Sequence, residues 1–338
     1  MNNNKKKQNA DMVKKFIFTI DEVKNSNSSE IVIKNNLTKE ILSIIPEYGG
    51  RLKELWLKNG SKNISILKKV NRIGSQDRDD IFTNAKLSPF AGRIKDGQYV
   101  FDNKRYNLPV NYPEEANACH GFLYSKEFHV ANTIVNDEKG LCRLVYLYKN
   151  ENEGYPFNYS IEITYILTAL EGLICTTRII NNSKNIIPLS DGWHHYFDVG
   201  VKIDDLELKL DVSEIIDLDS RNIPTKKKEP YNDFRTPSRI CDRYFDSCFK
   251  IDRLKGKAVT ELISKDHNIH LNIWQETGSN KFEYLVIYTP PDRKSIAVEP
   301  MTSNINSFNN GEDLIQLAPG KEYVSSYGIY LSKNGLSN

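Results

Sequence analysis

The sequence of 338 residues lacks the short motifs that mark nucleotide-dependent enzymes and several hydrolase classes. It contains no GxGxxG, no GxxxxGK[ST], no HExxH and no GxSxG. Each of these motifs positions a phosphate, a metal ion or a nucleophile for one kind of chemistry. Their absence therefore weighs against nucleotide-dependent chemistry, zincin proteolysis and α/β-hydrolase catalysis.

The sequence also lacks an excess of charge and any long apolar run. The 46 Lys and Arg residues nearly balance the 44 Asp and Glu residues, so no overall field favours nucleic acid or a membrane as partner. The apolar run Phe16–Ile20 is shorter than the ~7–15 apolar residues of a secretory signal, and no run approaches the ~18 of a membrane helix. We therefore expect a soluble cytoplasmic protein, with residues 1–12 as a flexible tail.

The sequence contains few cysteines, and none are spaced as a paired motif. The five cysteines form no CxxC motif, which argues against a disulfide framework and against a structural zinc site. We expect reduced and mostly buried cysteines. No linker rich in Pro, Gly or Ser divides the chain, so residues 13–338 are predicted to form one domain.

What the sequence does contain is apolar and polar residues in strict alternation. Such alternation indicates half-buried strands, and turn residues such as Lys58-Asn59-Gly60 separate them without intervening amphipathic helices. The pattern predicts an all-β protein, a large antiparallel β-sandwich or barrel. The predicted strands are 141–148, 157–167, 173–180, 206–212, 270–274 and 284–288, whereas 225–230, Thr-Lys-Lys-Lys-Glu-Pro, is predicted to be a solvated loop.

Two segments contain groups that can transfer protons. In Trp193-His194-His195-Tyr196, an extended backbone places His194 on one face with Tyr196 and His195 on the other face with Trp193. One histidine can then face a site, although a core histidine beside a surface one explains the pair equally well. Glu299 ends the apolar stretch Ile-Ala-Val and precedes a proline, so it has either an ion-pair partner or a pKa tuned for proton transfer.

Three further segments contain candidate binding residues. Arg93, in Ala-Gly-Arg-Ile-Lys-Asp-Gly, offers a rigid fork of donors, or it simply pairs with Asp96 at the surface. His120 precedes Gly121, which permits a tight turn beside the imidazole ring. Asp246 lies between aromatic residues, where its carboxylate can hold a hydroxyl group or an arginine.

Taken together, these segments resemble the aldose 1-epimerases, the galactose mutarotases. The segments Ala-Gly-Arg-Ile, Cys-His-Gly, Trp-His-His-Tyr-Phe, Phe-Asp-Ser-Cys-Phe and Val-Glu-Pro occur in the order seen in that family. Shorter matches extend the resemblance over about residues 30–333, for example Leu-Ala-Pro-Gly-Lys-Glu-Tyr near the end.

The resemblance implies a large antiparallel supersandwich that binds a sugar in an open cleft without metal or organic cofactor. It implies interconversion of the α and β anomers of a free hexose or related aldose. Glu299 is the general base and His194 the general acid by this resemblance, while Arg93, His120 and Asp246 bind the sugar substrate.

Three alternatives remain open at this level. A hexose-6-phosphate 1-epimerase has the same two proton-transfer groups and needs extra cations, for which Arg51, Lys53, Lys86 and Lys95 are candidates. A non-catalytic carbohydrate-binding protein on the same fold is expected to lack the acid or the base. A hydrolase usually needs two carboxylates, for which Glu299 and Asp246 are the candidates.

Overall fold

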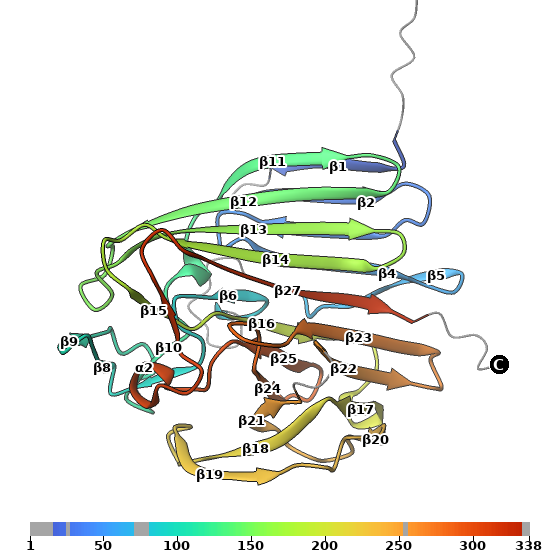
Figure 1. Cartoon of the computed structure of the whole chain (residues 1–338). Coiled ribbons are helices and arrows are strands. Elements are labelled where there is room, and N and C mark those ends of the chain that lie inside the picture. Colours follow the sequence, from blue (N-terminus) through green and yellow to red (C-terminus); the bar gives the residue numbers. More distant parts are fainter. Residues whose placement is uncertain (1–15, 25–27, 71–80, 253–255, 333–338) are drawn as a thin grey trace, which may run out of the picture.

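The computed structural model describes residues 16–24, 28–70, 81–252 and 256–332 (Figure 1). Within these ranges the regular structure is almost entirely antiparallel β-strand, as the alternation predicts. The exceptions are the 3₁₀ turns η1 (Leu123–Ser125) and η2 (Ile203–Asp205) and the short helix α2 (Ser307–Asn310). No helix in the described part of the chain is long and apolar enough to cross a membrane. The predicted flexible tail, residues 1–12, lies outside the described residues.

A nine-stranded sheet forms the centre of the molecule. In spatial order its strands are β11 (His129–Val135), β12 (Lys139–Lys149), β13 (Asn158–Thr168), β14 (Gly172–Asn181), β27 (Glu322–Leu331), β23 (Ile269–Glu276), β22 (Lys257–Ser264), β17 (Glu207–Leu210) and β20 (Ser238–Arg239). The C-terminal strand β27 lies between β14 and β23, so it joins the two halves of this sheet (Figure 1).

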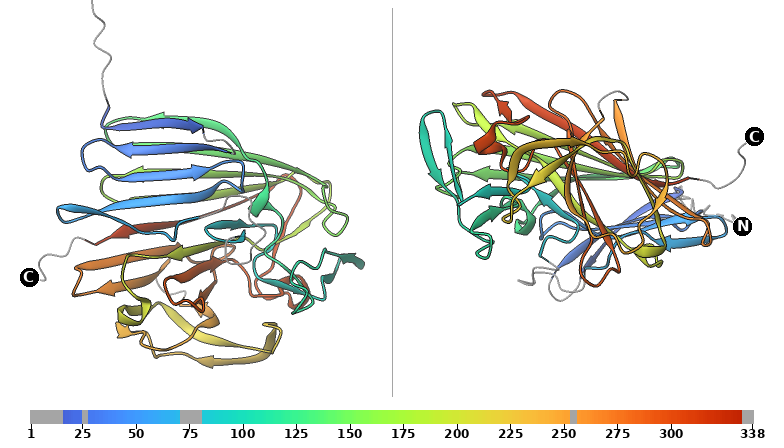
Figure 2. Two further views of the ribbon diagram at one scale, coloured as in Figure 1. Left: turned by 180° about the vertical axis from the view of Figure 1, so that it is seen from behind. Right: turned by 90° about the horizontal axis from the view of Figure 1, so that it is seen from below.

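A five-stranded sheet from the beginning of the chain covers one half of the nine-stranded sheet. Figure 2 shows this blue sheet stacked on strands β11–β14. Its strands in order are β1 (Phe18–Lys24), β2 (Ser29–Asn35), β3 (Ile41–Ile45), β4 (Arg51–Asn59) and β5 (Lys62–Ser65). Buried Phe18 and Ile33 from this sheet share one apolar cluster with Leu144 and Ile163 of the larger sheet.

A seven-stranded sheet lies beside the other half. Its strands in order are β19 (Pro224–Pro230), β18 (Val212–Leu218), β21 (Asp246–Ile251), β24 (Tyr284–Tyr288), β25 (Ile296–Met301), β16 (Gly192–Phe197) and β6 (Ala85–Leu87). The Trp193 ring of β16 contacts Tyr165 and Tyr327 of the central sheet, with ring centroids 6.1 and 5.5 Å apart. One face of β16 is therefore packed against the central sheet.

Three short strand pairs complete the described structure. They are β7 (Arg93–Lys95) with β10 (Asn117–Cys119), β8 (Gln98–Phe101) with β9 (Lys104–Asn107), and β15 (Ile187–Leu189) with β26 (Ile315–Leu317). All five cysteines have free thiols and four are buried, as predicted.

Two sequence predictions need correction. The single strand predicted over 206–212 is broken at Asp211, where the chain leaves β17 of the central sheet and enters β18 of the seven-stranded sheet. The basic segment 225–230 is solvated but is not a loop, because it forms the edge strand β19. Alternation alone does not distinguish one continuous strand from two strands that belong to different sheets.

Packing between the first two sheets predicts the effect of two substitutions on β12. Leu144 is fully buried, whereas 52% of Leu147 on the same strand is exposed. Leu144→Ala leaves a cavity, so we expect it to lower the free energy of unfolding by about 2–5 kcal/mol. Leu147→Ala is the matched control and should change that energy by less than about 0.5 kcal/mol. Urea unfolding measures both, and equal losses would contradict this packing.

Candidate active site

Strand β16 presents two histidines to opposite faces, as its sequence predicts. The His194 ring is stacked against Tyr196, and the His195 ring is stacked against Trp193 on the other face. His195 is fully buried and desolvation lowers its pKa to about 3, so it is a neutral core histidine. Neither histidine lies at the surface, because His194 is also buried.

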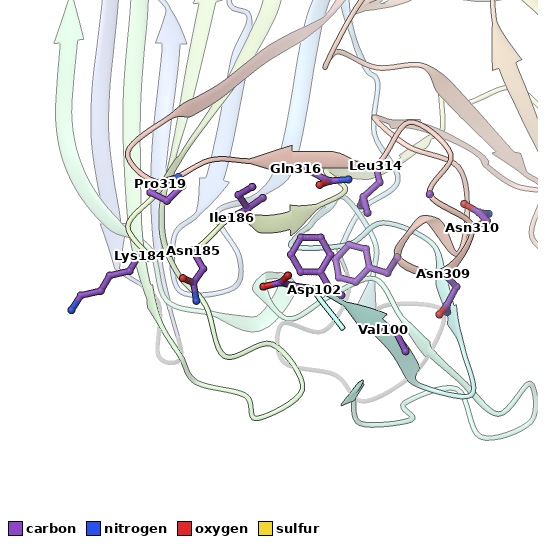
Figure 3. A pocket seen from close by; sticks show the side chains of 13 residues that line it. Val100, Asp102, Lys184, Asn185, Ile186, Asn309, Asn310, Leu314, Gln316 and Pro319 are labelled. Atoms are coloured by element: carbon purple, nitrogen blue, oxygen red, sulfur yellow. The ribbon is translucent and has the colours of Figure 1, made fainter. Parts of the chain in front are cut away.

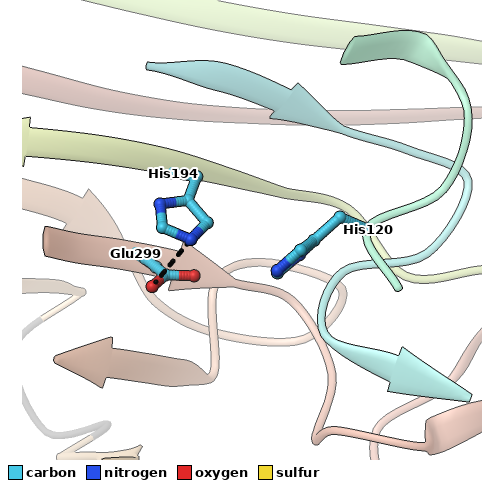
Figure 4. A group of neighbouring side chains, drawn as sticks. All are labelled: His120, His194 and Glu299. Carbon is cyan, nitrogen blue, oxygen red and sulfur yellow. Dashed lines mark ion pairs between the residues drawn. The ribbon is translucent and has the colours of Figure 1, made fainter. Parts of the chain in front are cut away.

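Strand β25 brings Glu299 to His194. The antiparallel register pairs Gly192 with Met301 and His195 with Val298, which sets Glu299 across from His194. Nε2 of His194 lies 3.3 Å from Oε1 of Glu299 (Figure 4). Of the two interpretations left open for Glu299, the structure thus supplies a partner, and that partner can itself transfer a proton.

Burial decides where the proton of this pair resides. Desolvation raises the pKa of Glu299 well above its ordinary value, although the positive charge of Arg93 opposes the shift. Desolvation likewise lowers the pKa of His194 to about 3. Both shifts disfavour the charged form, so the pair holds one proton on the carboxyl group beside a neutral imidazole. Transfer of that proton over 3.3 Å produces a carboxylate and an imidazolium.

A second His–Glu pair shows how different the surroundings of Glu299 are. On the central sheet, Nε2 of His270 lies 2.6 Å from Oε2 of Glu261. Burial would raise the pKa of Glu261, but hydrogen bonds from Lys209 and His270 outweigh burial and lower it. Glu261 is thus held as a carboxylate by the ammonium group of Lys209, whereas desolvation dominates the pKa of Glu299. Glu299 and His194 are buried and hold one proton between them, whereas Glu261 is only partly buried and forms an ion pair with Lys209.

His120 reaches the same point from the turn after β10. Its backbone has a φ of 63° and that of Gly121 has 69°, a left-handed conformation that favours glycine. A Cβ atom on Gly121 would lie 2.2 Å from the carbonyl oxygen of Ser88, so a side chain does not fit there. The centroid of the His120 ring lies 4.7 Å from that of Phe82 and 5.2 Å from that of His194. Figure 4 shows His120 beside His194 and Glu299.

A backbone hydrogen bond selects the tautomer of His120. The amide of Gly92 donates to Nδ1 of His120 over 3.3 Å, so Nδ1 must carry a lone pair. Desolvation, with the nearby His194 and Arg93, lowers the pKa of His120 well below 6.5. A neutral ring with an acceptor at Nδ1 has its proton on Nε2. His120 can therefore donate a hydrogen bond from Nε2 to an acceptor that binds beside His194 and Glu299.

The same tautomer bears on metal binding. One ligand atom each from His120, His194 and Glu299 lies within 4.8 Å of the other two, a set that could hold a metal ion. Ligation through Nε2 of His120 requires the proton on Nδ1, where the Gly92 amide already donates. As they are arranged, these residues fit an oxygen that accepts a hydrogen bond better than they fit a cation.

Arg93 is held by a residue that the sequence did not single out. Its Nε and Nη2 atoms donate to the two carboxylate oxygens of Glu115, over 2.5 and 2.9 Å. The alternative of a surface pair with Asp96 is wrong, because Asp96 instead accepts from Arg221 and the Arg93 side chain is only 14% exposed. The bidentate bond to Glu115 leaves the Nη1 group of Arg93 to face other partners.

Asp246 completes the group from the start of β21. Its Oδ2 accepts from the amide of Asn222 over 3.3 Å, and the same amide donates to Glu115 over 3.1 Å. Asp246 and Arg93 both act electrostatically on Glu299. The structure thus brings all five predicted residues together, whereas Glu115 and Asn222 were missed. Nothing in their local sequence marks them, since they contact the site through turns distant in the chain.

A separate hollow of about 650 Å³ lies elsewhere (Figure 3). Its lining comes from β8, the turn before β15, α2 and β26, and includes Val100, Asn185, Asn309 and Gln316. None of the five predicted residues lines it. The hollow is therefore distinct from the His194–Glu299 site.

Comparison with known proteins places the chain in a family. The family model described as aldose 1-epimerase matches residues 29–330, so the chain belongs to the aldose 1-epimerase family. The uncharacterized protein YihR of Escherichia coli (strain K12) is 24% identical over 251 residues, covering 72% of this chain and 77% of that protein. Galactose mutarotase of Rattus norvegicus is 22% identical over 218 residues, covering 56% of this chain and 61% of the enzyme.

A solved structure supports the fold. The galactose mutarotase-like protein from Clostridium acetobutylicum superposes with a TM-score of 0.81 at 24% identity, covering 94% of this chain and 99% of that one. The predicted family resemblance and the predicted antiparallel β architecture are both confirmed.

The protonation states at the site predict an NMR result. His120 and His194 should stay neutral between pH 8 and pH 5, because desolvation lowers the pKa of both. In ¹⁵N-histidine spectra their ring signals should not move over this range, and His120 should show the Nε2–H tautomer. Titration of either ring near pH 6.5, or an Nδ1–H tautomer at His120, would contradict the geometry described.

Proposed function

We propose that the protein is an aldose 1-epimerase that interconverts the α and β anomers of a free, neutral hexose or related aldose. The observation that carries this proposal is the His194–Glu299 pair, a buried acid and base 3.3 Å apart that share one proton. Mutarotation needs one group that takes a proton and one that gives a proton, and it needs no cofactor.

The reaction follows from those two groups. Glu299, as carboxylate, removes the proton of the C1 hydroxyl, while protonated His194 delivers a proton to the ring oxygen O5. The C1–O5 bond breaks and the aldehyde forms. Rotation about C1–C2 presents the other face of the aldehyde, and reclosure reverses both proton transfers. General acid and general base catalysis each contribute about 10²–10⁴-fold.

The shared proton suits a reaction that runs in both directions. Ring opening leaves the proton on Glu299, and reclosure returns it to the sugar while His194 recovers its own. Because each cycle restores the pair, no external proton donor is needed. The opposite pKa shifts of the two groups place the resting proton on Glu299, and transfer of that proton to His194 over 3.3 Å gives the carboxylate and imidazolium with which ring opening begins.

The surrounding groups fit the binding roles implied by the family. His120 offers an Nε2–H donor, and Arg93 offers the Nη1 donors that Glu115 does not use. Both are placed to stabilise charge that develops on O5. Asp246 offers acceptor oxygens for hydroxyl groups farther from C1.

The cations near the site favour a neutral substrate over a sugar phosphate. Of the four candidates for a phosphate site, Arg51 donates to backbone carbonyls that include those of Tyr48 and Tyr124. Lys53 pairs with Glu30, and Lys86 pairs with Asp191 in the interior. Lys95 remains exposed on β7, and Arg93 itself is neutralised by Glu115. Three of the four candidate cations, and Arg93 itself, are therefore already engaged, and Lys95 alone of the four is exposed.

The mechanism predicts a large loss in Glu299→Gln. The amide has nearly the shape of the acid but accepts no proton, so kcat for fresh α-D-glucose or α-D-galactose should fall about 10²–10⁴-fold in a polarimetric assay. Glu261→Gln is the matched control, since it removes the carboxylate of the other His–Glu pair, and it should retain full activity. An unchanged rate in Glu299→Gln would refute the mechanism.

The polarimetric assay, together with calorimetry, distinguishes an enzyme from a non-catalytic sugar-binding protein. A protein that only binds sugar would show saturable binding of the free hexose in calorimetry, with a mutarotation rate equal to that of buffer alone. Because both proton-transfer groups are present and in contact, we expect turnover instead.

The charge argument predicts a preference among substrates. Glucose 6-phosphate should be turned over with a kcat/KM at least about tenfold below that of glucose, because a phosphate buried without a cation loses its hydration uncompensated. The rates of both anomerisations, measured at one ionic strength, test this expectation. A higher kcat/KM for the phosphate would favour a hexose-6-phosphate 1-epimerase.

A further inference from the structure

A fully buried ion pair lies beside β16, the strand that carries His194. Nζ of Lys86 on β6 lies 2.5 Å from Oδ2 of Asp191, and neither side chain has any exposed surface. The ammonium group also lies 4.5 Å from the centroid of the Trp193 ring. Lys86 is the residue paired with Trp193 in the β6–β16 register, so it shares the face of β16 that points away from His194.

This ion pair belongs to a cluster that connects β16 with β25, in which the backbone of Asp191 makes the link to β25. Lys86 also donates to the carbonyl oxygen of Gly192, the first residue of β16, over 3.3 Å. The amide of Asp191 donates to Oγ1 of Thr302 over 2.8 Å, and the amide of Thr302 donates back to the carbonyl of Asp191 over 2.9 Å. Thr302 directly follows β25. One cluster therefore joins β6, the start of β16 and the end of β25.

Stability alone does not account for such a pair. Two charges removed from water lose their hydration, and the attraction between them regains that loss only with good geometry. Burial lowers the pKa of Lys86, and the charge and hydrogen bond of Asp191 oppose that shift. Well-packed apolar residues of similar volume often serve stability equally well in such a position. What apolar residues cannot supply is directional hydrogen bonding to Gly192.

We propose that Lys86 and Asp191 are positioning residues. They hold β16 and β25 at the register and spacing that keep His194 and Glu299 within proton-transfer distance. The proposal rests on the proposed function, since it concerns the same pair. Lys86 acts through its bond to Gly192, and Asp191 acts by holding Lys86 and through its backbone bonds to Thr302. Small displacements of reacting groups are costly, because about 1 Å of misplacement can reduce a rate about 10²-fold.

The test replaces both charges at once. Lys86→Met/Asp191→Leu leaves no unpaired charge, so the variant should keep a Tm close to that of the wild type. Because neither residue binds the sugar, KM should stay unchanged while kcat falls about 10²-fold. A crystal structure of the variant should show the Nε2–Oε1 separation increased above 3.3 Å. If kcat stays within twofold of the wild type in the folded double variant, the proposal is refuted.

A second variant and a control keep the test decisive. Thr302→Val retains both charges but removes the acceptor of the Asp191 amide, and it should lower kcat without changing KM. If the double variant does not fold, an unchanged kcat in Thr302→Val refutes the proposal. Lys53→Met/Glu30→Leu removes an ion pair of the five-stranded sheet and should leave kcat intact.

Failure of the proposed function would look different. In that case the wild-type protein itself shows no anomerisation of any sugar tested. The crystallographic separation of Nε2 and Oε1 in the double variant then decides the positioning role without an assay. A separation still at 3.3 Å would refute it, and a longer one would support it.

Discussion

The pairing of β16 with β25 is the contact on which the site depends. These strands are distant in the chain, yet their register sets His194 across from Glu299 and leaves 3.3 Å between the two reacting atoms. Because side chains alternate along a strand, a slip of one residue would turn His194 toward the central sheet and bring His195 to the site. The packing of Trp193 against Tyr165 and Tyr327 opposes that slip.

Burial gives this pair its chemistry. In water a carboxyl group and an imidazole differ in pKa by about two units, with the carboxyl group as the stronger acid. Desolvation raises the pKa of Glu299 and lowers that of His194, so a neutral carboxylic acid lies beside a neutral imidazole. In the partly buried pair of Glu261 and His270 the contact is 2.6 Å, and Lys209 holds the carboxylate charged. The same two residue types thus include a carboxylate paired with a lysine in one setting and form a candidate acid–base pair in the other.

The residues around the pair are held by a second set of contacts. Gly92 selects the tautomer of His120, and Glu115 orients the guanidinium group of Arg93. Sequence reasoning identified the five candidate residues that the fold brings together, because their motifs occur in the family's order. It missed Glu115, Asn222 and the link between Asp191 and Thr302, because those contacts join turns and strand ends far apart in the chain.

The sequence by itself determined the all-β class, the faces of β16 and the identity of five candidate residues, because alternation and motif order are local properties. Asp96, the alternative partner that it offered for Arg93, is the wrong carboxylate, and residues 206–212 were read as one strand. The local sequence records neither the partner of a side chain nor a change of sheet. Only the tertiary structure decided the proton's location, the tautomer of His120 and the engagement of Lys86 and Arg51. Each of these depends on desolvation and on partners that folding alone brings together.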